Sequence, residues 1–332
     1  MAPELSIVIP IFNEEPNLVQ LHEELVGVLT SWGRPFEVIY VDDGSRDRSF
    51  EILADIQARD PRVRVIQFRR NFGQTAAFAA GFAAARGRLI VTSDGDLQND
   101  PADIPSLVER LEREDLDIVA GWRKDRKDAW LNRRLPSTIA NALISWATGV
   151  KLRDYGCSLK VFRAEVVKPL RLYGELHRFL PALASEMGVR IAEQAVNHRP
   201  RVHGRSKYGI SRTVRVILDL LTVKFLLSYS TRPLQMFGLV GGAMGMTGAI
   251  ILGYLGFMRL TQEVYPLNER MPLVMFAILL GFTGVQLVTL GLLAEMQART
   301  YHESQGKPVY AIRRVLETVD APHLAAGSSR RD

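Results

Sequence analysis

The sequence predicts an α/β protein with a mostly parallel β-sheet, helices on both of its faces, and two transmembrane helices near the C-terminus. Three observations lead to this prediction. Short apolar runs alternate with amphipathic stretches early in the chain, polar clusters follow several of those runs, and two long uncharged segments lie in the last third. Such alternation is typical of a parallel sheet whose helices cover both faces.

Four apolar, β-branched runs are expected to form strands, and three stretches between them are expected to form helices. The stretch at residues 17–29, for example, places five apolar side chains on one stripe, as an amphipathic helix requires. The expected strands are 5–11, 36–41, 63–68 and 89–92, and the expected helices are 17–29, 49–59 and 75–86. Ligands of such a sheet bind beyond the carboxyl ends of its strands.

Two later segments lack charged side chains for longer than a helix of a soluble protein usually does. Residues 233–258 and 271–294 are each bounded by charged residues and contain none. Each exceeds the roughly 20 residues that a helix needs to cross a bilayer. A buried helix hairpin is the alternative, but two such runs joined by a short polar loop favour a transmembrane hairpin.

The chain is therefore expected to have four parts. These are a cytoplasmic sheet domain (1–210), an amphipathic interfacial helix region (211–230), a transmembrane hairpin (231–296) and a cytoplasmic tail (297–332). Basic residues precede the first span and follow the second, which places both termini in the cytosol by the positive-inside rule. An ordinary surface helix is the alternative for the interfacial region. The single cysteine, Cys157, fits a reducing compartment.

The charge balance and the missing motifs exclude several classes of protein. The net charge of +6 is attributed to anionic lipid and phosphate ligands, not to nucleic acid, because no zinc spacing and no basic groove with interleaved aromatic residues occurs. The glycine fingerprint G-x-G-x-x-G of dinucleotide-binding enzymes does not follow the first strand, and no P-loop occurs. Any phosphate group must be neutralised by a metal and by basic side chains.

Asp94-Gly95-Asp96 is the candidate metal site, because it directly follows an expected strand. Two carboxylates at a strand end can hold a hard divalent cation, Mg²⁺ or Mn²⁺, that keeps other positions for water and substrate phosphates. Gln98 can add a neutral oxygen ligand. With Asp42 and Asp43 beyond a neighbouring strand, four carboxylates are expected to converge on one crevice.

Two basic segments are candidate phosphate sites. Residues 123–134 contain six basic side chains, including Arg123 and Arg133, and Ser137 follows them. Guanidinium groups match phosphate oxygens, although a solvated surface loop is the alternative. In the second segment, Arg201 and Lys207 lie in a loop that can close over a donor pyrophosphate.

A G-x-x-x-G pattern, Gly241 and Gly245, lies in the first expected span. This pattern permits close packing of helices. It is therefore treated as a hint of oligomerisation only.

Six motifs, in their order along the chain, resemble the family 2 glycosyltransferases of the GT-A (Rossmann-like) fold, and within them the bacterial polyprenyl-phosphate glycosyltransferases. Residues 8–14 and 41–45 are similar to the nucleotide-binding motifs, and residues 94–98 to the metal motif. Three further motifs, at 69–74, 154–157 and 204–208, are similar to undecaprenyl-phosphate members, including glucosyltransferases and the formamido-arabinose transferase. Gly95 stands where alanine is usual, Lys160 where arginine is common, and Arg205 where glutamate is frequent.

The resemblance implies a role for individual residues. Asp94 and Asp96 would be the catalytic carboxylates, and they would hold the metal together with Gln98. Arg201 would contact the donor phosphates. The nucleoside would contact Pro10, Phe12, Glu14, Asp42 and Asp94, and the lipid phosphate would contact Arg123, Arg133 and Ser137.

The resemblance also implies an activity, which is inverting transfer of a sugar from a nucleotide-sugar to undecaprenyl or another polyprenyl phosphate. The lipid-linked sugar would serve cell-envelope glycan or lipopolysaccharide modification at the bacterial cytoplasmic membrane. UDP-glucose or a UDP-amino-arabinose derivative is the preferred donor, GDP-mannose stays open, and relatives suggest a homotetramer. A non-catalytic nucleotide-binding assembly module and a processive polysaccharide synthase are the alternatives, although the Q-x-x-R-W motif of the latter does not occur.

Overall fold

The computed structural model describes residues 2–124, 145, 149–172, 176–185, 187–200, 233–261, 267–304 and 310–318. The chain divides into two compact units, which are treated separately. The first comprises Met1–Leu220 and Pro308–Asp332, and the second comprises Leu221–Lys307. The expected interfacial helix region (211–230) lies outside the described residues.

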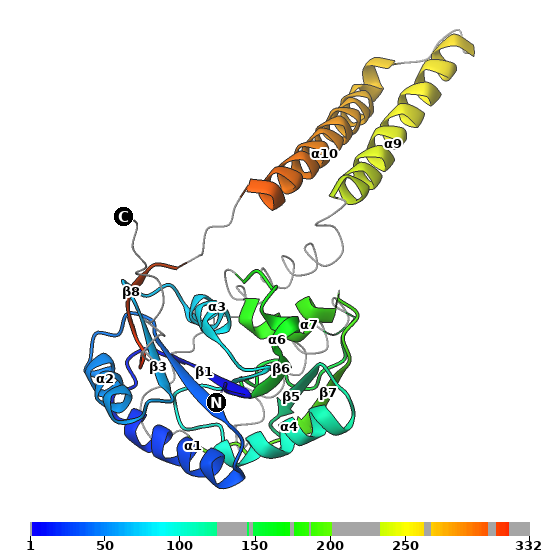
Figure 1. Ribbon diagram of the computed structural model, residues 1–332. Coiled ribbons are helices and arrows are strands. Elements are labelled where there is room, and N and C mark those ends of the chain that lie inside the picture. Colours follow the sequence, from blue (N-terminus) through cyan, green and yellow to red (C-terminus); the bar gives the residue numbers. More distant parts are fainter. Residues whose placement is uncertain are drawn as a thin grey trace, which may run out of the picture. The chain divides into compact units, whose positions relative to one another are not determined.

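In the described part of the first unit, eight strands form one mixed sheet in the order β7-β5-β6-β4-β1-β2-β3-β8 (Figure 1). The strands are β1 (Leu5–Ile11), β2 (Phe36–Asp42), β3 (Val63–Phe68), β4 (Leu89–Thr92), β5 (Ile118–Trp122), β6 (Lys160–Arg163), β7 (Ile191–Ala195) and β8 (Ile312–Leu316). The central strands β4, β1, β2 and β3 run parallel, as do β5 and β7. β6 is antiparallel to β4 and β5, and β8 is antiparallel to β3. The prediction of a mostly parallel sheet is confirmed.

Helices cover both faces of this sheet, as the sequence predicts (Figure 1). They are α1 (Leu18–Trp32), α2 (Ser49–Arg59), α3 (Gln74–Ala84), α4 (Ile104–Arg113), α6 (Ala164–Val167) and α7 (Leu180–Ser185), with 3₁₀ turns η1 (Pro101–Asp103) and η3 (Leu176–Phe179). One core contains Ile7 and Ile9 of β1 with the apolar faces of α1, α2 and α4. The other contains Val8 of the same strand with α3, α6 and α7. Successive side chains of a strand point to opposite faces, so β1 contributes to both cores.

All four expected strands and all three expected helices are present. α2 has the predicted ends, whereas the ends of α1 and α3 differ by one to three residues. α1 continues three residues beyond its expected end at residue 29. It ends at Gly33, whose φ of 79° is left-handed and whose N–H is donated to the carbonyl of Leu29. Glycine adopts this conformation without steric cost, and for that reason it commonly ends helices.

β8 was not expected, because residues 297–332 were assigned to a tail. Four of its five residues are exposed and two of them are arginines, so the segment has no buried apolar face that would mark a strand. It pairs with β3 at the edge of the sheet. β8, which follows the second apolar helix in the sequence, is therefore part of the first unit.

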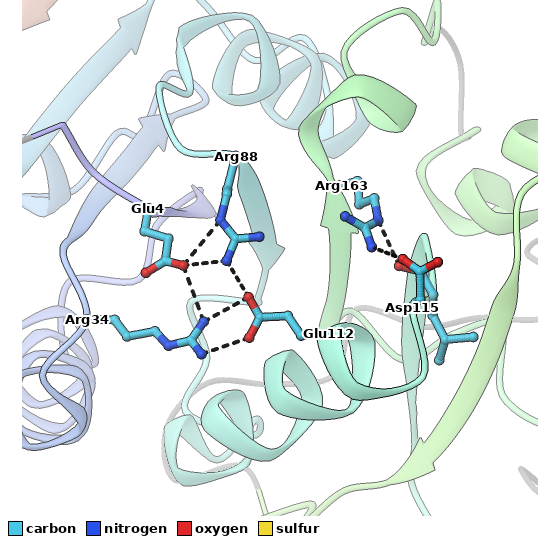
Figure 2. A network of polar contacts seen from close by, with 7 residues as sticks. Glu4, Arg34, Arg88, Glu112, Asp115 and Arg163 are labelled. Atoms are coloured by element: carbon cyan, nitrogen blue, oxygen red, sulfur yellow. Dashed lines mark hydrogen bonds and ion pairs between the residues drawn. The ribbon is translucent and has the colours of Figure 1, made fainter.

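Charged side chains link the amino ends of β1 and β4 to α4, as Figure 2 shows. Arg34 donates two hydrogen bonds to Glu112, of 3.0 and 2.7 Å. Arg88 contacts both Glu4 and Glu112. These side chains are partly exposed, so the network contributes modestly to stability. It lies at the end of the strands opposite to the polar clusters.

The second unit contains two long apolar helices, α9 (Pro233–Thr261) and α10 (Met271–Ser304), with a 3₁₀ turn, η4 (Leu267–Arg270), directly before α10. Phe237–Thr261 and Met271–Leu293 are long and apolar enough to cross a membrane. Little of either segment is buried within the protein, which differs from the core helix of a soluble domain.

Glycines allow α9 and α10 to pack closely. A Cβ atom on Gly241 would lie 2.5 Å from the carbonyl oxygen of Gly284, and a Cβ atom on Gly284 would lie 2.9 Å from the nitrogen of Gly245. The close packing suggested by the G-x-x-x-G pattern is therefore present, and its partner is the other helix of the same hairpin.

Candidate nucleotide and metal site

The candidate site lies at the carboxyl ends of β4, β1 and β2, which are neighbours in the sheet. The Asp43 N–H is donated to the carbonyl of Ile11 over 2.8 Å, and the Ser93 N–H to that of Val8 over 3.2 Å. The polar segments that follow the three strands therefore start side by side. This is the edge at which ligands of open α/β sheets bind.

Hydrogen bonds fix the segment after β1 against the segment after β2. The Asn13 N–H is donated to Ser45 Oγ over 3.0 Å, and Asn13 Oδ1 accepts the Arg46 N–H over 2.8 Å. The Glu14 N–H is donated to Ser49 Oγ over 3.0 Å. Asn13 has a left-handed φ of 56°, which asparagine tolerates better than most residues. Both candidate nucleoside loops are thus held in place before any ligand binds.

Asp42 is the last residue of β2, and its carboxylate is completely buried. Oδ1 accepts the Ser45 N–H over 3.1 Å. Among the described residues Oδ2 has no hydrogen-bond partner. Burial raises the pKa of this carboxyl. A buried acceptor without a donor is costly, and a ligand N–H or hydroxyl would satisfy it.

The Asp43 carboxylate binds backbone N–H groups of the segment before α3. Its two oxygens accept the N–H groups of Phe72 over 2.7 Å and Gly73 over 2.9 Å. Gly44 allows the same approach, because a Cβ atom there would lie 2.5 Å from the backbone carbon of Arg70. The expected convergence of four carboxylates is therefore wrong, and no group of three or more His, Cys, Asp or Glu side chains in the described ranges could hold a metal.

We expect Asp43 to make the stability of the first unit depend on pH. Burial raises its pKa from 3.8 to about 6. Between these two pH values the folded state holds more of this proton than the unfolded state, so stability falls as pH rises from about 4 to 6. Asp43→Asn should remove this part of the dependence. Thermal unfolding of the two proteins from pH 4 to 7 measures it, and parallel curves would contradict the assignment.

Asp94 and Asp96 lie just beyond β4, on a loop with an unusual backbone. Asp94 Oδ1 accepts a hydrogen bond of 2.8 Å from Gln74 Nε2, and Asp96 Oδ1 accepts the Gln98 N–H over 3.2 Å. Burial and the nearby Asp96 raise the pKa of Asp94. Leu97 has a φ of 61°, which for a branched residue is strained, and such strain is concentrated at functional sites.

Gly95 allows the loop after β4 that carries Asp94 and Asp96 to pack against β1. A Cβ atom on Gly95 would lie 2.6 Å from Ile11 Cδ1 and 3.4 Å from the carbonyl oxygen of Pro10. An alanine at this position would require the Ile11 side chain to move. Pro10 and Phe12 are half-buried at this end of β1, beside the metal loop.

The residues present fit a hard divalent cation. Asp94 and Asp96 supply two carboxylates that disfavour each other's charge, and a cation would relieve that repulsion. Gln98 adds an amide on the same loop. A site with so few protein ligands keeps positions for water and phosphate oxygens, which is the arrangement that Mg²⁺ and similar ions use with nucleotides.

Arg123, a candidate acceptor ligand, is held by Asp154. Its Nε and one terminal nitrogen donate hydrogen bonds of 2.7 and 2.8 Å to the two carboxylate oxygens. Both side chains are largely buried, and the Asp154 carboxylate raises the pKa of Arg123 although burial opposes this. A Cβ atom on Gly156 would lie 3.1 Å from the guanidinium, so a side chain at that position would press against it.

Lys160 is buried behind the same segment. Its ammonium group donates hydrogen bonds to the carbonyl oxygens of Tyr155, over 3.4 Å, and of Cys157. Burial lowers the pKa of Lys160. The side chain therefore fixes the loop that carries Asp154.

The sequence analysis assigned no role to Gln74, Asp154 and Lys160. Gln74 and Asp154 lie in the motifs at 69–74 and 154–157, so the resemblance of these motifs to relatives is the signal that could have pointed to them. The contacts themselves join residues 20 and 31 positions apart, which no local pattern shows.

Four candidate residues, Arg133, Ser137, Arg201 and Lys207, lie outside the described residues. The start of the second basic segment is described. The Arg199 N–H is donated to the Gln98 carbonyl over 2.9 Å, and its guanidinium pairs with Glu24 and with Asp100. The described start of this segment therefore lies directly beside Gln98.

Comparisons with known proteins agree with this geometry. Residues 6–171 match the model of glycosyl transferase family 2. The dodecaprenyl-phosphate galacturonate synthase of Rhizobium johnstonii is 48% identical over 95% of this chain and 93% of its own. The undecaprenyl-phosphate 4-deoxy-4-formamido-L-arabinose transferase of Pseudomonas paraeruginosa is 40% identical over 94% of this chain and 90% of its own.

A solved structure shares the fold. Glucosyl-3-phosphoglycerate synthase from Mycobacterium tuberculosis, crystallised with Mn²⁺, UDP and phosphoglyceric acid, superimposes with a TM-score of 0.53 at 20% identity. The similarity covers 67% of this chain and 78% of that one.

Proposed function

The chain belongs to glycosyl transferase family 2, and we propose that it transfers a sugar from a nucleotide-sugar to the phosphate of a polyprenyl phosphate. The resemblance to this family, inferred from six motifs, is confirmed. One observation carries the proposal furthest. A pair of carboxylates and an unsatisfied buried acceptor lie at the ends of the two strands that flank β1, in a chain nearly half identical to a polyprenyl-phosphate sugar transferase.

The donor nucleotide is proposed to bind between the segments after β1 and β2. Asp42 Oδ2 needs a donor, which the base or ribose of a nucleotide can supply. Pro10, Phe12 and Glu14 lie on the segment that is fixed against this loop. Asp94 follows the strand on the other side of β1.

A divalent cation, Mg²⁺ or Mn²⁺, is proposed to be held by Asp94, Asp96 and Gln98. When bound, it would neutralise charge on the departing diphosphate. Gln74 holds Asp94 in position for this task. Arg201 and Lys207 are proposed to add positive charge from the basic segment that begins beside Gln98.

The acceptor is proposed to bind through Arg123, Arg133 and Ser137. A phosphate monoester has a second pKa of about 6, so its oxygen is largely anionic near neutral pH and needs no strong general base. It attacks the anomeric carbon from the face opposite the nucleotide, and the nucleoside diphosphate leaves with the bonding electrons. The protein must bring two anionic groups together, and the Asp154 contact holds the Arg123 guanidinium fixed for this.

The donor sugar is proposed to be a hexuronate carried on UDP. The relative that acts in galacturonate transfer is 48% identical, whereas the formamido-arabinose transferases reach 40% or less. UDP-glucose, a UDP-amino-arabinose derivative and GDP-mannose are the competing donors.

The two apolar helices are proposed to anchor the enzyme in the cytoplasmic membrane, with the sheet domain (1–210) and both termini in the cytosol. The phosphate of the acceptor lipid would then lie at the cytoplasmic surface of the membrane, on the same side as the sheet domain. Reporter fusions at each terminus test this orientation.

A donor screen tests the proposal. Purified full-length protein is incubated with undecaprenyl phosphate, Mn²⁺ and each labelled nucleotide-sugar, and the organic phase is counted. We expect label from UDP-galacturonate to enter the lipid fraction fastest. Faster use of the formamido-arabinose donor would overturn the assignment of the sugar, and no lipid product from any donor would overturn the activity.

A further inference from the structure

An aromatic cluster joins the chain after the apolar helices to the sheet beside the candidate site. Tyr310 stacks on Phe68, the last residue of β3, with ring centroids 5.1 Å apart and planes inclined by 13°. Phe68 meets Phe72 edge to face at 5.7 Å and 89°. Tyr310 is half-buried and Phe68 is completely buried. The segment that follows α10 therefore forms one side of this cluster.

Backbone and ionic contacts fix that segment on the sheet. β8 pairs antiparallel with β3, and the Arg69 N–H is donated to the Ala311 carbonyl over 3.0 Å. Further along, Glu317 pairs with Arg64 over 3.0 Å and with Arg86 over 2.9 Å. Tyr310 is thus held at the start of a strand that is anchored along its length.

The other side of the cluster leads directly to the two candidate carboxylate loops. The N–H groups of Phe72 and Gly73 bind the Asp43 carboxylate, which follows β2. The next residue, Gln74, donates its hydrogen bond to Asp94. Three consecutive residues therefore contact both loops of the donor site.

We propose that Tyr310 is a positioning residue for the donor site, acting through Phe68 and Phe72 on residues 72–74. This inference rests on the proposed function. In the part of the chain that the structure describes, Tyr310 stacks on Phe68, and it would act on the donor site through that ring. Its ring buttresses the segment that holds Asp43 and Asp94, so the chain after the apolar hairpin completes the donor site.

Variants of the full-length protein in detergent test this. UDP binding in the presence of Mn²⁺, and KM for donor and for undecaprenyl phosphate, are measured for Tyr310→Ala and Tyr310→Phe. Arg313→Ala is the matched control, because Arg313 is exposed on the same strand. A stacked aromatic pair in a partly buried site affects an equilibrium by roughly tenfold. We expect Tyr310→Ala to weaken UDP binding and raise the KM for the donor by about that factor, while its KM for undecaprenyl phosphate stays unchanged. Tyr310→Phe and Arg313→Ala should behave like the wild type.

A double-mutant cycle separates positioning from general loss of structure. If Tyr310 acts through Gln74, Tyr310→Ala with Gln74→Leu should weaken UDP binding less than the product of the single effects. Thermal unfolding shows whether each variant is folded, and Tyr310→Leu, which keeps apolar volume, replaces an unfolded Tyr310→Ala. Any of three results would overturn the inference. These are a UDP affinity of Tyr310→Ala within twofold of the wild type, an equal rise of KM for donor and lipid, or single-variant effects that simply multiply in the double variant. Lack of UDP binding by the wild type would instead overturn the proposed donor site.

Discussion

Asp96→Asn should reduce sugar transfer by at least about a thousandfold, because it removes one of only two carboxylates available to the proposed cation. Asp96 is 7% exposed and directly precedes Leu97, whose φ of 61° is left-handed. An asparagine keeps the size of the side chain and its hydrogen bond to the Gln98 N–H. The loss should therefore appear in kcat, with little change in thermal stability.

Turnover is measured as a function of Mn²⁺ and Mg²⁺ concentration, with Asp55→Asn, an exposed carboxylate on α2, as the control. The control should behave like the wild type. Near-normal turnover of Asp96→Asn without added metal would show that the carboxylate does not act through a cation.

Asp154→Leu should destabilise the sheet domain by about 3–5 kcal/mol, because it leaves the Arg123 guanidinium buried without its partner. The pair is bidentate, and the two side chains are 13% and 5% exposed. Removing one member of a buried pair costs much more than the pair contributes, since the remaining charge has lost both water and its counter-ion. The free energy of unfolding in denaturant measures this loss.

The double variant Arg123→Leu/Asp154→Leu is the informative comparison. It removes both charges of the pair, so it should be more stable than Asp154→Leu alone while losing use of the lipid acceptor. If the double variant were as unstable as the sum of the single variants, the pair would not be coupled.

The sequence predicted the parallel part of the fold well, for a physical reason. Strands buried on both faces are continuous apolar runs, and three of the four expected strands have the predicted ends. α1 was predicted to end early, because the apolar stripe stops before Gly33 and only the left-handed glycine marks the real end. β8 carried no signal, since an exposed edge strand rich in arginine is recognised only by its pairing with β3.

Topology likewise predicted where the candidate site lies but not how each side chain is used. Parallel strand ends meet at one edge, which placed Asp42 and Asp94 at the ends of the two strands that flank β1. The direction of Asp43 depends on a loop 29 residues later, and the Arg123 contact depends on a segment 31 residues later. These contacts join residues far apart in the sequence. The motifs therefore identified Asp43 and Arg123 but not the residues that they bind.

The central claim is that the bond broken lies between the sugar and the diphosphate, with the nucleoside diphosphate as the leaving group. Donor labelled with ³²P in the β-phosphate and separately with ¹⁴C in the sugar, incubated with the full-length protein and undecaprenyl phosphate, tests this directly. The account predicts that ¹⁴C enters the organic phase while ³²P stays in the aqueous phase as nucleoside diphosphate. Transfer of both labels to the lipid, with release of nucleoside monophosphate, would contradict it.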